Sequence, residues 1–408
     1  MKLIKTPTKG MNDYLPNDVA LREYVKNLII SSYAADGFCM IETPAVEHIE
    51  NLTGKNGGEN EKLIFKILKR GEKLANASSE DEICDSGLRY DLTVPLSRYY
   101  ANNSAKLPSP FLAMQIGNVW RADRPQKGRY RQFTQCDIDI LGDSTQTAEI
   151  TLISSTAGVL RKLGFDNFTI RINDRRLLKL SAEACGFAPE EHDKIFIILD
   201  KMDKIGLDGV KNELIAEGYS EESVQKYIAL YDGCDSVTVE KFSESLGESG
   251  NAIASDLATI MRCASAATVG GCKIAFDPTL VRGMSYYTGT IFEIRMDGYG
   301  YSVGGGGRYD EMLGKFMGQK VPACGFSLGF ERIVSALADN NFVPPTASRS
   351  IAFLASKKME ESEMLKMYAD AAKLRAEGAR VLVTAKMKNV YFQKNKLSEE
   401  GYTEFVEY

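Results

Sequence analysis

Three arginines of the chain occur in settings that suit the binding of a polyphosphate. Arg121 follows FLAMQIGNVW, Arg129 lies in the basic stretch RADRPQKGRYR, and Arg332 follows ACGFSLGFE. A guanidinium group engages phosphate oxygens in a bidentate manner and keeps its charge when it is removed from water. The chain has no GxxxxGK[ST] loop and no GxGxxG between a strand and a helix, so a bound nucleotide would depend on such arginines. Ordinary surface ion pairs are the alternative that composition alone favours.

Acidic and amide side chains accompany these arginines. In RYRQFTQCDIDILG, Gln135, Asp137 and Asp139 share one face of a predicted strand, because successive side chains of a strand alternate between its faces. The two aspartates could bind magnesium, although such cations usually have more than two oxygen ligands. A polar face paired with cations is the alternative.

Aromatic and glycine-rich segments follow later in the chain. Tyr286 and Tyr287 are neighbours on a predicted strand and therefore point to opposite faces, which predicts that one is in the core and the other can hydrogen-bond a ligand. The run Gly304 to Gly307 would let a ligand lie against bare backbone, and a β-bulge or a turn is the alternative.

Composition restricts the class of protein. With 408 residues, 44% hydrophobic and 26% charged, the chain is expected to form two or three globular domains. It has no apolar run of membrane-spanning length and no apolar region at its start, so a cytoplasmic protein is expected. Eight scattered cysteines without CxxC spacing, and only two histidines, predict neither zinc nor disulfides. The net charge of -5 leaves Arg121 to Arg131 as the densest basic patch for a nucleic acid.

The elements that must position these residues can be read from periodicity. Residues 16–36 have apolar residues at helical spacing, and the following FCMIETPAVEHIENL predicts an edge strand ended by Pro44. Residues 111–142 predict two strands joined by a basic hairpin loop. From about 178 to 268 the pattern is helical and polar, which indicates a helical insertion.

The remaining segments alternate between strand and helix. CKIAFDPTL, YYTGTIFEIRM and the glycine run predict strands, and ACGFSLGFERIVSALADN predicts a strand that passes into a helix. A Pro-containing connector at 340–349 precedes SIAFLAS, a helix at about 360–377 and RVLVTA. This order indicates a small α/β domain after the connector.

Taken together and in order, these segments resemble the histidyl-tRNA synthetase family over nearly the whole chain. The three motifs that define class II synthetases correspond to the helix and strand ending at Pro44, VWRADRPQKGRYRQFTQCDIDILG and GFSLGFERI. VRGMSYYTGTIFEI and GGGGRYDEML are similar to segments specific to the histidine enzymes, and GLRYDLTVPLSRY and KGMNDYLP match the family too.

The resemblance implies an α+β fold with an antiparallel sheet flanked by helices. It implies a catalytic domain over residues 1–340 that contains the helical insertion, a linker at 341–349, and an α/β domain over 350–408 similar to the anticodon-binding module. The implied activity is that of a cytoplasmic ligase of protein biosynthesis, which forms histidyl-adenylate from L-histidine and ATP with Mg²⁺ and transfers the histidyl group to histidine tRNA. A homodimer formed through the first motif is expected, because its apolar edge needs cover.

Residue roles follow from the resemblance position by position. Arg121 and Arg332 match arginines that bind the α- and γ-phosphates, Arg129 matches another ATP contact, and Arg282 matches the arginine between the histidine carboxylate and the α-phosphate. The histidine-binding set that the resemblance implies is Asp91, Thr93, Gln135, Asp139, Arg282, Tyr286 and Tyr287. Within it, Asp91 and Thr93 match positions that hold the ammonium, and Asp139 and Tyr287 match the pair that grips the imidazole. Gln126 matches a contact to the extra base pair of histidine tRNA.

Two departures from the family pattern stand out. Ser285 replaces the usual Asp, which affects a local support of the site more than the chemistry. The C-terminal domain is expected to stop at YTEFVEY, short of the module's final helix and strand, so either a weakened anticodon binding or a truncated product is expected.

Two other functions remain open from sequence. One is the catalytically silent paralogue that regulates ATP phosphoribosyltransferase, which usually lacks the anticodon module and loses the ATP arginines. The other is a tRNA-binding module without enzyme activity, although such a protein would have no reason to keep a costly charged pocket. Histidine-dependent exchange of pyrophosphate with ATP separates both from the ligase.

Overall fold

The computed structural model describes residues 3–53, 59–79, 82–126, 128–234, 237–268, 272–282, 286–345 and 349–408. The chain forms two compact units. The first comprises Met1–Asp13 and Val25–Asn340, and the second comprises Tyr14–Tyr24 and Asn341–Tyr408. Helix α1 (Pro16–Ala35) therefore contributes residues to both units.

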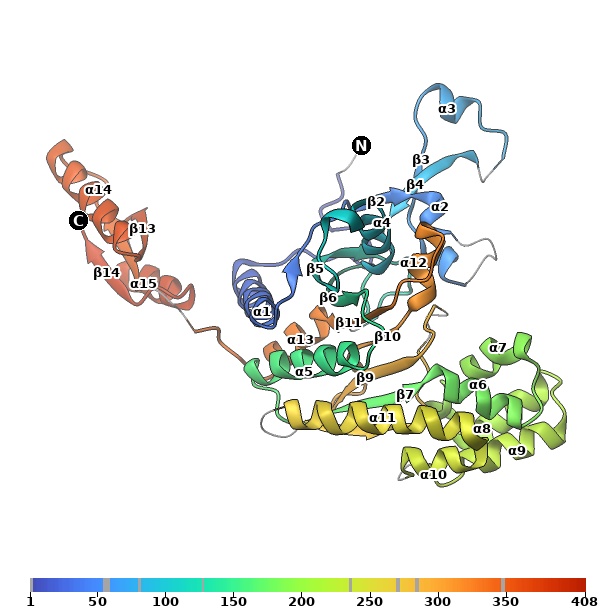
Figure 1. The fold of residues 1–408 in the computed structure, drawn as a ribbon. Coiled ribbons are helices and arrows are strands. Elements are labelled where there is room, and N and C mark those ends of the chain that lie inside the picture. Colours follow the sequence, from blue (N-terminus) through green and yellow to red (C-terminus); the bar gives the residue numbers. More distant parts are fainter. Residues whose placement is uncertain are drawn as a thin grey trace. The chain divides into compact units, whose positions relative to one another are not determined.

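A large twisted sheet forms the centre of the first unit (Figure 1). Over the described residues its strand order is β1-β5-β6-β11-β10-β9-β7-β8. The pairs from β5 to β7 are antiparallel, whereas β1 with β5 and β7 with β8 are parallel. The strands are β1 (Cys39–Met40), β5 (Phe111–Trp120), β6 (Gln132–Leu141), β7 (Phe168–Asp174), β8 (Lys273–Phe276), β9 (Thr290–Met296), β10 (Ser302–Arg308) and β11 (Ala323–Gly329). The predicted antiparallel sheet is confirmed.

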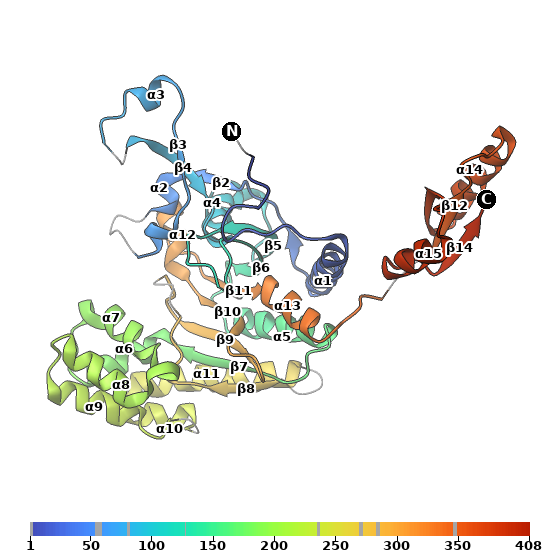
Figure 2. The ribbon, with the colours of Figure 1, turned by 180° about the vertical axis from the view of Figure 1, so that it is seen from behind.

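Two helices lie side by side along this sheet in both views, namely α5 (Thr147–Lys162) and α11 (Gly247–Ala267) (Figures 1 and 2). Helix α1 packs against α5 through Tyr33. This side chain is fully buried, and its hydroxyl lies 3.4 Å from that of Thr156 in α5. The apolar faces of α5 and α11 pack on the strands of the sheet and form a core with them. As expected, β11 passes directly into α13 (Phe330–Asp339).

The predicted helical insertion is confirmed and begins at Arg175. Its helices gather in one cluster beside β7 (Figure 2). They are α6 (Arg175–Ala184), α7 (His192–Leu199), α8 (Met202–Ala216), α9 (Glu221–Tyr231) and α10 (Val239–Ser243), followed by α11. Tyr227 and Tyr231 are buried at its centre with ring centroids 4.9 Å apart. The cluster thus has an apolar core of its own, which continues into that of the sheet.

The segment around Pro44 differs from the single edge strand that was predicted. Strand β1 ends at Met40, and the chain re-forms a strand only at β2 (Val46–His48), in a second antiparallel sheet of order β2-β4-β3. The other strands of this sheet are β3 (Lys66–Leu68) and β4 (Cys84–Leu88). Pro44 lies in the gap because it has no N–H to donate to a ladder. Buried Glu47 of β2 pairs with Arg98 of α4 (Thr93–Asn103) at 2.5 Å.

The second unit contains a three-stranded parallel sheet of order β13-β12-β14. Its elements are β12 (Ser350–Ala355), α14 (Glu361–Ala376), β13 (Arg380–Ala385), α15 (Val390–Glu399) and β14 (Glu404–Glu407). The predicted small α/β fold is confirmed. The last helix and strand add to the strand-helix-strand pattern that was read from the sequence.

Candidate active site

A polar cleft of about 560 Å³ opens over the middle strands of the large sheet. An inner pocket of about 20 Å³ adjoins it and shares Tyr287, Gly305 and Ser327 with it. The cleft is lined, among others, by Arg121, Arg129, Gln135, Arg282, Glu293, Glu331 and Arg332. The inner pocket is lined, among others, by Thr93, Asp137, Asp139 and Tyr309. The fold therefore brings cations and acids from distant parts of the chain to one place.

Arg121 is fixed where the first strand of the hairpin ends. Its Nε donates to the carbonyl of Tyr90 at 3.1 Å, and its guanidinium lies over the rings of Tyr90 and Phe133, at 4.2 and 5.2 Å from their centroids. Stacking of a cation on aromatic faces holds it in place while its N–H groups stay available. Arg129, on the same loop, pairs with Asp123 at 3.0 Å and is half exposed.

Arg332 approaches the cleft from the first turn of α13. One of its Nη groups donates to the carbonyl of Ser302, and its guanidinium lies 5.3 Å from the ring centroid of Tyr301. Removal from water lowers the pKa of Arg332 from its ordinary value. The preceding Glu331 accepts from the backbone N–H of Thr134 at 3.1 Å, which ties the helix start to β6.

Arg282 lies at the boundary between the cleft and the inner pocket. Its Nη1 donates to Glu293 at 2.8 Å, and its Nε is buried with no partner among the described residues. Burial opposes the charge, but Tyr287 and Glu293 outweigh burial and raise the pKa of Arg282. The group therefore stays cationic and has an unused donor.

The inner pocket is acidic and phenolic. Tyr309 donates its hydroxyl proton to Asp139 at 2.6 Å. Burial raises the pKa of Asp139 to about 7, and this hydrogen bond limits the rise. Burial and the neighbouring Asp139 raise the pKa of Asp137 well above its ordinary value, and its Oδ1 has no partner among the described residues. The pocket thus offers both a hydrogen-bond acceptor and a phenolic group to a small polar ligand.

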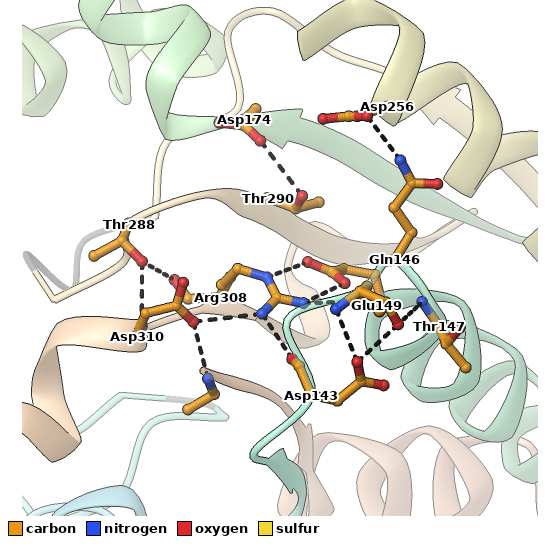
Figure 3. Close-up of polar contacts among 12 residues, drawn as sticks. Asp143, Gln146, Thr147, Glu149, Asp174, Asp256, Thr288, Thr290, Arg308 and Asp310 are labelled. Atoms are coloured by element: carbon orange, nitrogen blue, oxygen red, sulfur yellow. Dashed lines mark hydrogen bonds and ion pairs between the residues drawn. The ribbon is translucent and has the colours of Figure 1, made fainter. Parts of the chain in front are cut away.

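A network of polar contacts holds Arg308 and Asp310, the two neighbours of Tyr309 in the chain (Figure 3). Arg308 binds Glu149 of α5 through two hydrogen bonds of 2.7 Å and donates to the carbonyl of Asp143 at 3.0 Å. Asp310, at the start of α12 (Asp310–Met317), accepts from the backbone N–H of Ala323 at 2.9 Å. Residues on both sides of Tyr309 are therefore anchored, which supports the position from which its hydroxyl donates to Asp139.

Some of the other predicted residues line the cavities, and others do not. Thr93 and Gln135 line them, and Gln135 donates to Ser327 at 3.0 Å. Asp91 is buried at the start of α4, where it accepts from the backbone N–H of Val94 at 3.0 Å, and burial raises its pKa. Gln126 pairs with Arg129 in the loop. Ser285 lies outside the described residues.

Tyr286 was placed in the histidine-binding set, but it lines neither cavity. Its ring packs against those of Tyr287 and Tyr309, with centroids 4.8 and 5.9 Å away. Both tyrosines precede β9 and lie outside any strand, so their predicted placement on a strand is wrong. Tyr287 is buried and lines both cavities, whereas Tyr286 is partly buried. The division of the pair into a core tyrosine and a site tyrosine stays a prediction.

Comparison with known proteins identifies the family. The model of the family described as "Histidyl-tRNA synthetase" matches residues 10–333. A "Histidine--tRNA ligase" from Leifsonia xyli subsp. xyli is 42% identical over 98% of this chain and 94% of that protein. A protein of the same name from Christiangramia forsetii is 36% identical over 90% of this chain and 87% of that protein. The chain belongs to the histidyl-tRNA synthetase family.

Solved structures agree with this membership. The crystal structure of histidyl-tRNA synthetase from Nostoc sp. PCC 7120 covers 98% of this chain and 90% of that one, with a TM-score of 0.80 and 28% identity. A structure titled "ATP phosphoribosyltransferase regulatory subunit/histidyl-tRNA synthetase from Bacillus halodurans C" covers 100% and 99% of the two chains, with a TM-score of 0.79 and 21% identity. The latter likeness shows the fold alone.

Two side chains of this synthetase-family site were missed in the sequence. Tyr309 follows the glycine run and Glu293 lies in TIFEIRM, so both fall in segments that carry the family resemblance. Their positions in these segments are the only signal that the sequence offers. The contacts of Glu293 with Arg171 and of Tyr309 with Asp139 depend on strand order.

Among the residues that the structure describes, no group of three or more His, Cys, Asp or Glu side chains could hold a metal ion. Within the same ranges, no helix has the length and apolar character required to cross a bilayer.

Proposed function

We propose that this protein activates L-histidine with ATP to form histidyl-adenylate and transfers the histidyl group to the 3′ terminal adenosine of histidine tRNA. The observation that carries the proposal is the junction of two cavities: a cleft with four arginines opens onto a pocket with two acids and two phenols. Such an arrangement suits a polyphosphate joined to a small ligand with hydrogen-bonding nitrogens.

The arginines are assigned to the nucleotide. Arg121 and Arg332 bind the α- and γ-phosphates of ATP, and Arg129 adds a contact from the loop. Magnesium enters with ATP as part of the substrate, because this cation is commonly held by one or two carboxylates together with phosphates. Glu331 is a carboxylate that lines the cleft.

Arg282 is assigned to the reacting groups. An oxygen of the histidine carboxylate attacks the α-phosphorus of ATP and forms a new P–O bond. The bond from the α-phosphorus to the oxygen that bridges it to the β-phosphate breaks, and pyrophosphate leaves. Two anions must approach each other, so fixed positive charge between them lowers the barrier without a general base. The buried Nε of Arg282, which has no partner among the described residues, is a donor that this step can use.

The inner pocket is assigned to the amino acid. Asp139 and Tyr287 bind the imidazole nitrogens, with Tyr309 holding Asp139 in place. Asp91, Thr93 and Gln135 are assigned to the ammonium and carboxylate end. An apolar amino acid would leave these buried groups unpaired, and this cost selects histidine.

The partners follow from the same proposal. The tRNA acceptor end approaches the loop that carries Gln126, and the unit formed chiefly by residues 341–408 is assigned to the anticodon, with 341–349 as its linker. The protein is a homodimer through α1 and β1, and it acts in the cytoplasm. Met40, which is exposed on β1, supplies apolar surface for a second copy.

Histidine-dependent exchange of pyrophosphate with ATP tests the proposal. The ligase is expected to show exchange with L-histidine and none when histidine is left out or replaced by leucine. Retention of all four arginines argues against the regulatory paralogue, which is expected to show no exchange. A purified, folded protein that binds histidine but catalyses no exchange would refute the proposed activity.

A further inference from the structure

The segment that carries Arg282 is not part of the sheet. Arg282 lies between β8 and β9, outside any strand, directly before residues that the structure does not describe. Its side chain, however, lies across the glycine strand. A Cβ built on Gly305 would be 2.7 Å from Cζ of Arg282, so only a glycine leaves room for the guanidinium here. Because the strand has no side chain at this position, the guanidinium group of Arg282 must be held by hydrogen bonds from its own N–H groups.

Glu293 makes that contact. One carboxylate oxygen accepts from Nη1 of Arg282 at 2.8 Å, and the other accepts from Nη2 of Arg171 at 2.9 Å. All three side chains are largely buried, with exposed fractions of 24% for Arg282 and 17% for the other two. A charge-assisted hydrogen bond in such a setting is stronger than one at the surface.

The carboxylate itself is rigidly placed. Glu293 is the fourth residue of β9, where its register partners are Arg171 on β7 and Gly305 on β10. Arg171 is anchored in turn by Asp277 at 2.8 Å. Glu293 therefore lies between two strand neighbours. One is Gly305, on which Arg282 lies, and the other is Arg171, which binds the Glu293 carboxylate.

We propose that Glu293 is a positioning residue for histidine activation, which holds the guanidinium of Arg282 flat on Gly305 so that its remaining N–H groups face the reacting carboxylate and phosphate. This inference rests on the proposed function. Glu293 acts through Arg282, and Arg171 acts by keeping the second carboxylate oxygen occupied. Without Glu293, the guanidinium of Arg282 would occupy several rotamers. It would then lose its alignment with the histidine carboxylate and the α-phosphate, on which its stabilisation of the transition state depends.

The test is a double-mutant cycle in the exchange assay on the full chain. Glu293→Ala is expected to lower kcat about ten- to a hundredfold, the size expected for one hydrogen bond to a charged group, and to change the KM for histidine by less than about threefold. In the Arg282→Ala background, the same change is expected to cause no further loss, because the group that Glu293 positions is already absent. An equal loss in both backgrounds would overturn the inference, since it would show that Glu293 acts by another route.

Asp203→Asn is the matched control. Asp203 also pairs with Arg171, at 3.3 Å, but it is half exposed and has no contact with Glu293 or Arg282 among the described interactions. Exchange within about twofold of wild type is expected, as for most exposed ion pairs. A loss as large as that of Glu293→Ala would assign the effect to the whole charge network and contradict a specific role of Glu293.

A structural readout keeps this inference separate from the proposed function. Glu293→Gln preserves shape but has one acceptor oxygen for two guanidinium groups, so it serves if the alanine variant does not fold. A crystal structure of either variant is expected to show Arg282 displaced from Gly305, and an unmoved guanidinium would refute the positioning role. If wild-type protein shows no exchange, the proposed function fails, and the crystal structure still decides the position of Arg282.

Discussion

Replacement of Tyr309 with phenylalanine is expected to raise the KM for histidine most strongly near neutral pH. The change removes one hydroxyl group, which donates to Asp139 at 2.6 Å. The ring is fully buried and stays packed against Tyr286, so little volume is lost. The consequence is therefore mainly electrostatic: the ionised form of Asp139 loses a strong donor, and its pKa rises.

The size of the effect follows from two constants. A hydrogen bond to a charged group contributes about 1.5–3 kcal/mol, and about 1.4 kcal/mol corresponds to one pKa unit. The pKa of Asp139, which burial raises to about 7, is then expected to reach between about 8 and about 9 in the variant. At neutral pH its ionised fraction falls from about one half to between about one tenth and one hundredth. Because the carboxylate is the acceptor for the imidazole N–H, the KM for histidine rises about five- to fiftyfold.

The assay is histidine-dependent exchange measured from about pH 6 to about pH 9.5. Because the pKa of Asp139 is raised, its ionised carboxylate forms only as the pH rises through that pKa. Affinity for histidine is therefore expected to increase through about pH 7 in the wild type and only above about pH 8 in the variant, so the difference between them shrinks at high pH. Tyr100→Phe, which removes the hydroxyl of another largely buried tyrosine outside the cavities, is the control and is expected to be unchanged. A defect of constant size across this range would refute the reasoning.

Three further outcomes are expected. Arg282→Ala is expected to bind histidine nearly normally in equilibrium dialysis but to lose about 2.7–4 kcal/mol of transition-state stabilisation, so wild-type exchange rates would contradict its assigned role. Glu149→Gln removes the charge that Arg308 binds most closely but leaves Asp310 at 3.4 Å, and is expected to lower the free energy of unfolding by about 1.5–3 kcal/mol in urea titrations, the size of a hydrogen bond to a charged group. Sedimentation at working concentration is expected to give a dimer, and a monomer would count against pairing through α1 and β1.

Sequence patterns predicted the elements well where periodicity was long or alternation was strict. The helix over 16–36 and the hairpin over 111–142 matched α1, β5 and β6 closely, because burial of one face imposes a regular spacing on the side chains. The small sheet of β2, β3 and β4 was not foreseen. Its strands are three to five residues long, so they carry too few side chains for a period to be visible.

The candidate site was predictable only in part. The cleft arginines were singled out because guanidinium groups suit phosphates, and their roles, like that of Asp139, came from the family resemblance. Tyr309 and Glu293 were not singled out, since their importance depends on which side chains they meet across the sheet. Tyr309 reaches Asp139 from a position 170 residues away along the chain. Contacts of this kind arise from strand order, which local sequence does not encode. The pocket roles of all these residues stay predictions.

The stretch Gly304 to Gly307 has a consequence for how such a site can change. These four residues lie on the fifth of the eight strands, between β9 and β11, so neighbouring ladders support a segment that has little tendency to form a strand by itself. Each of these glycines faces a neighbour that an added methyl group would meet. At Gly305 the methyl group would lie 2.7 Å from the guanidinium of Arg282, and at Gly306 and Gly307 it would press on the backbone carbonyls of Gly325 and Thr290. The floor of the cavities therefore cannot be reshaped at this strand without displacing a charged group or an adjacent strand, so changes in the size of the ligand must be accommodated by the residues around it.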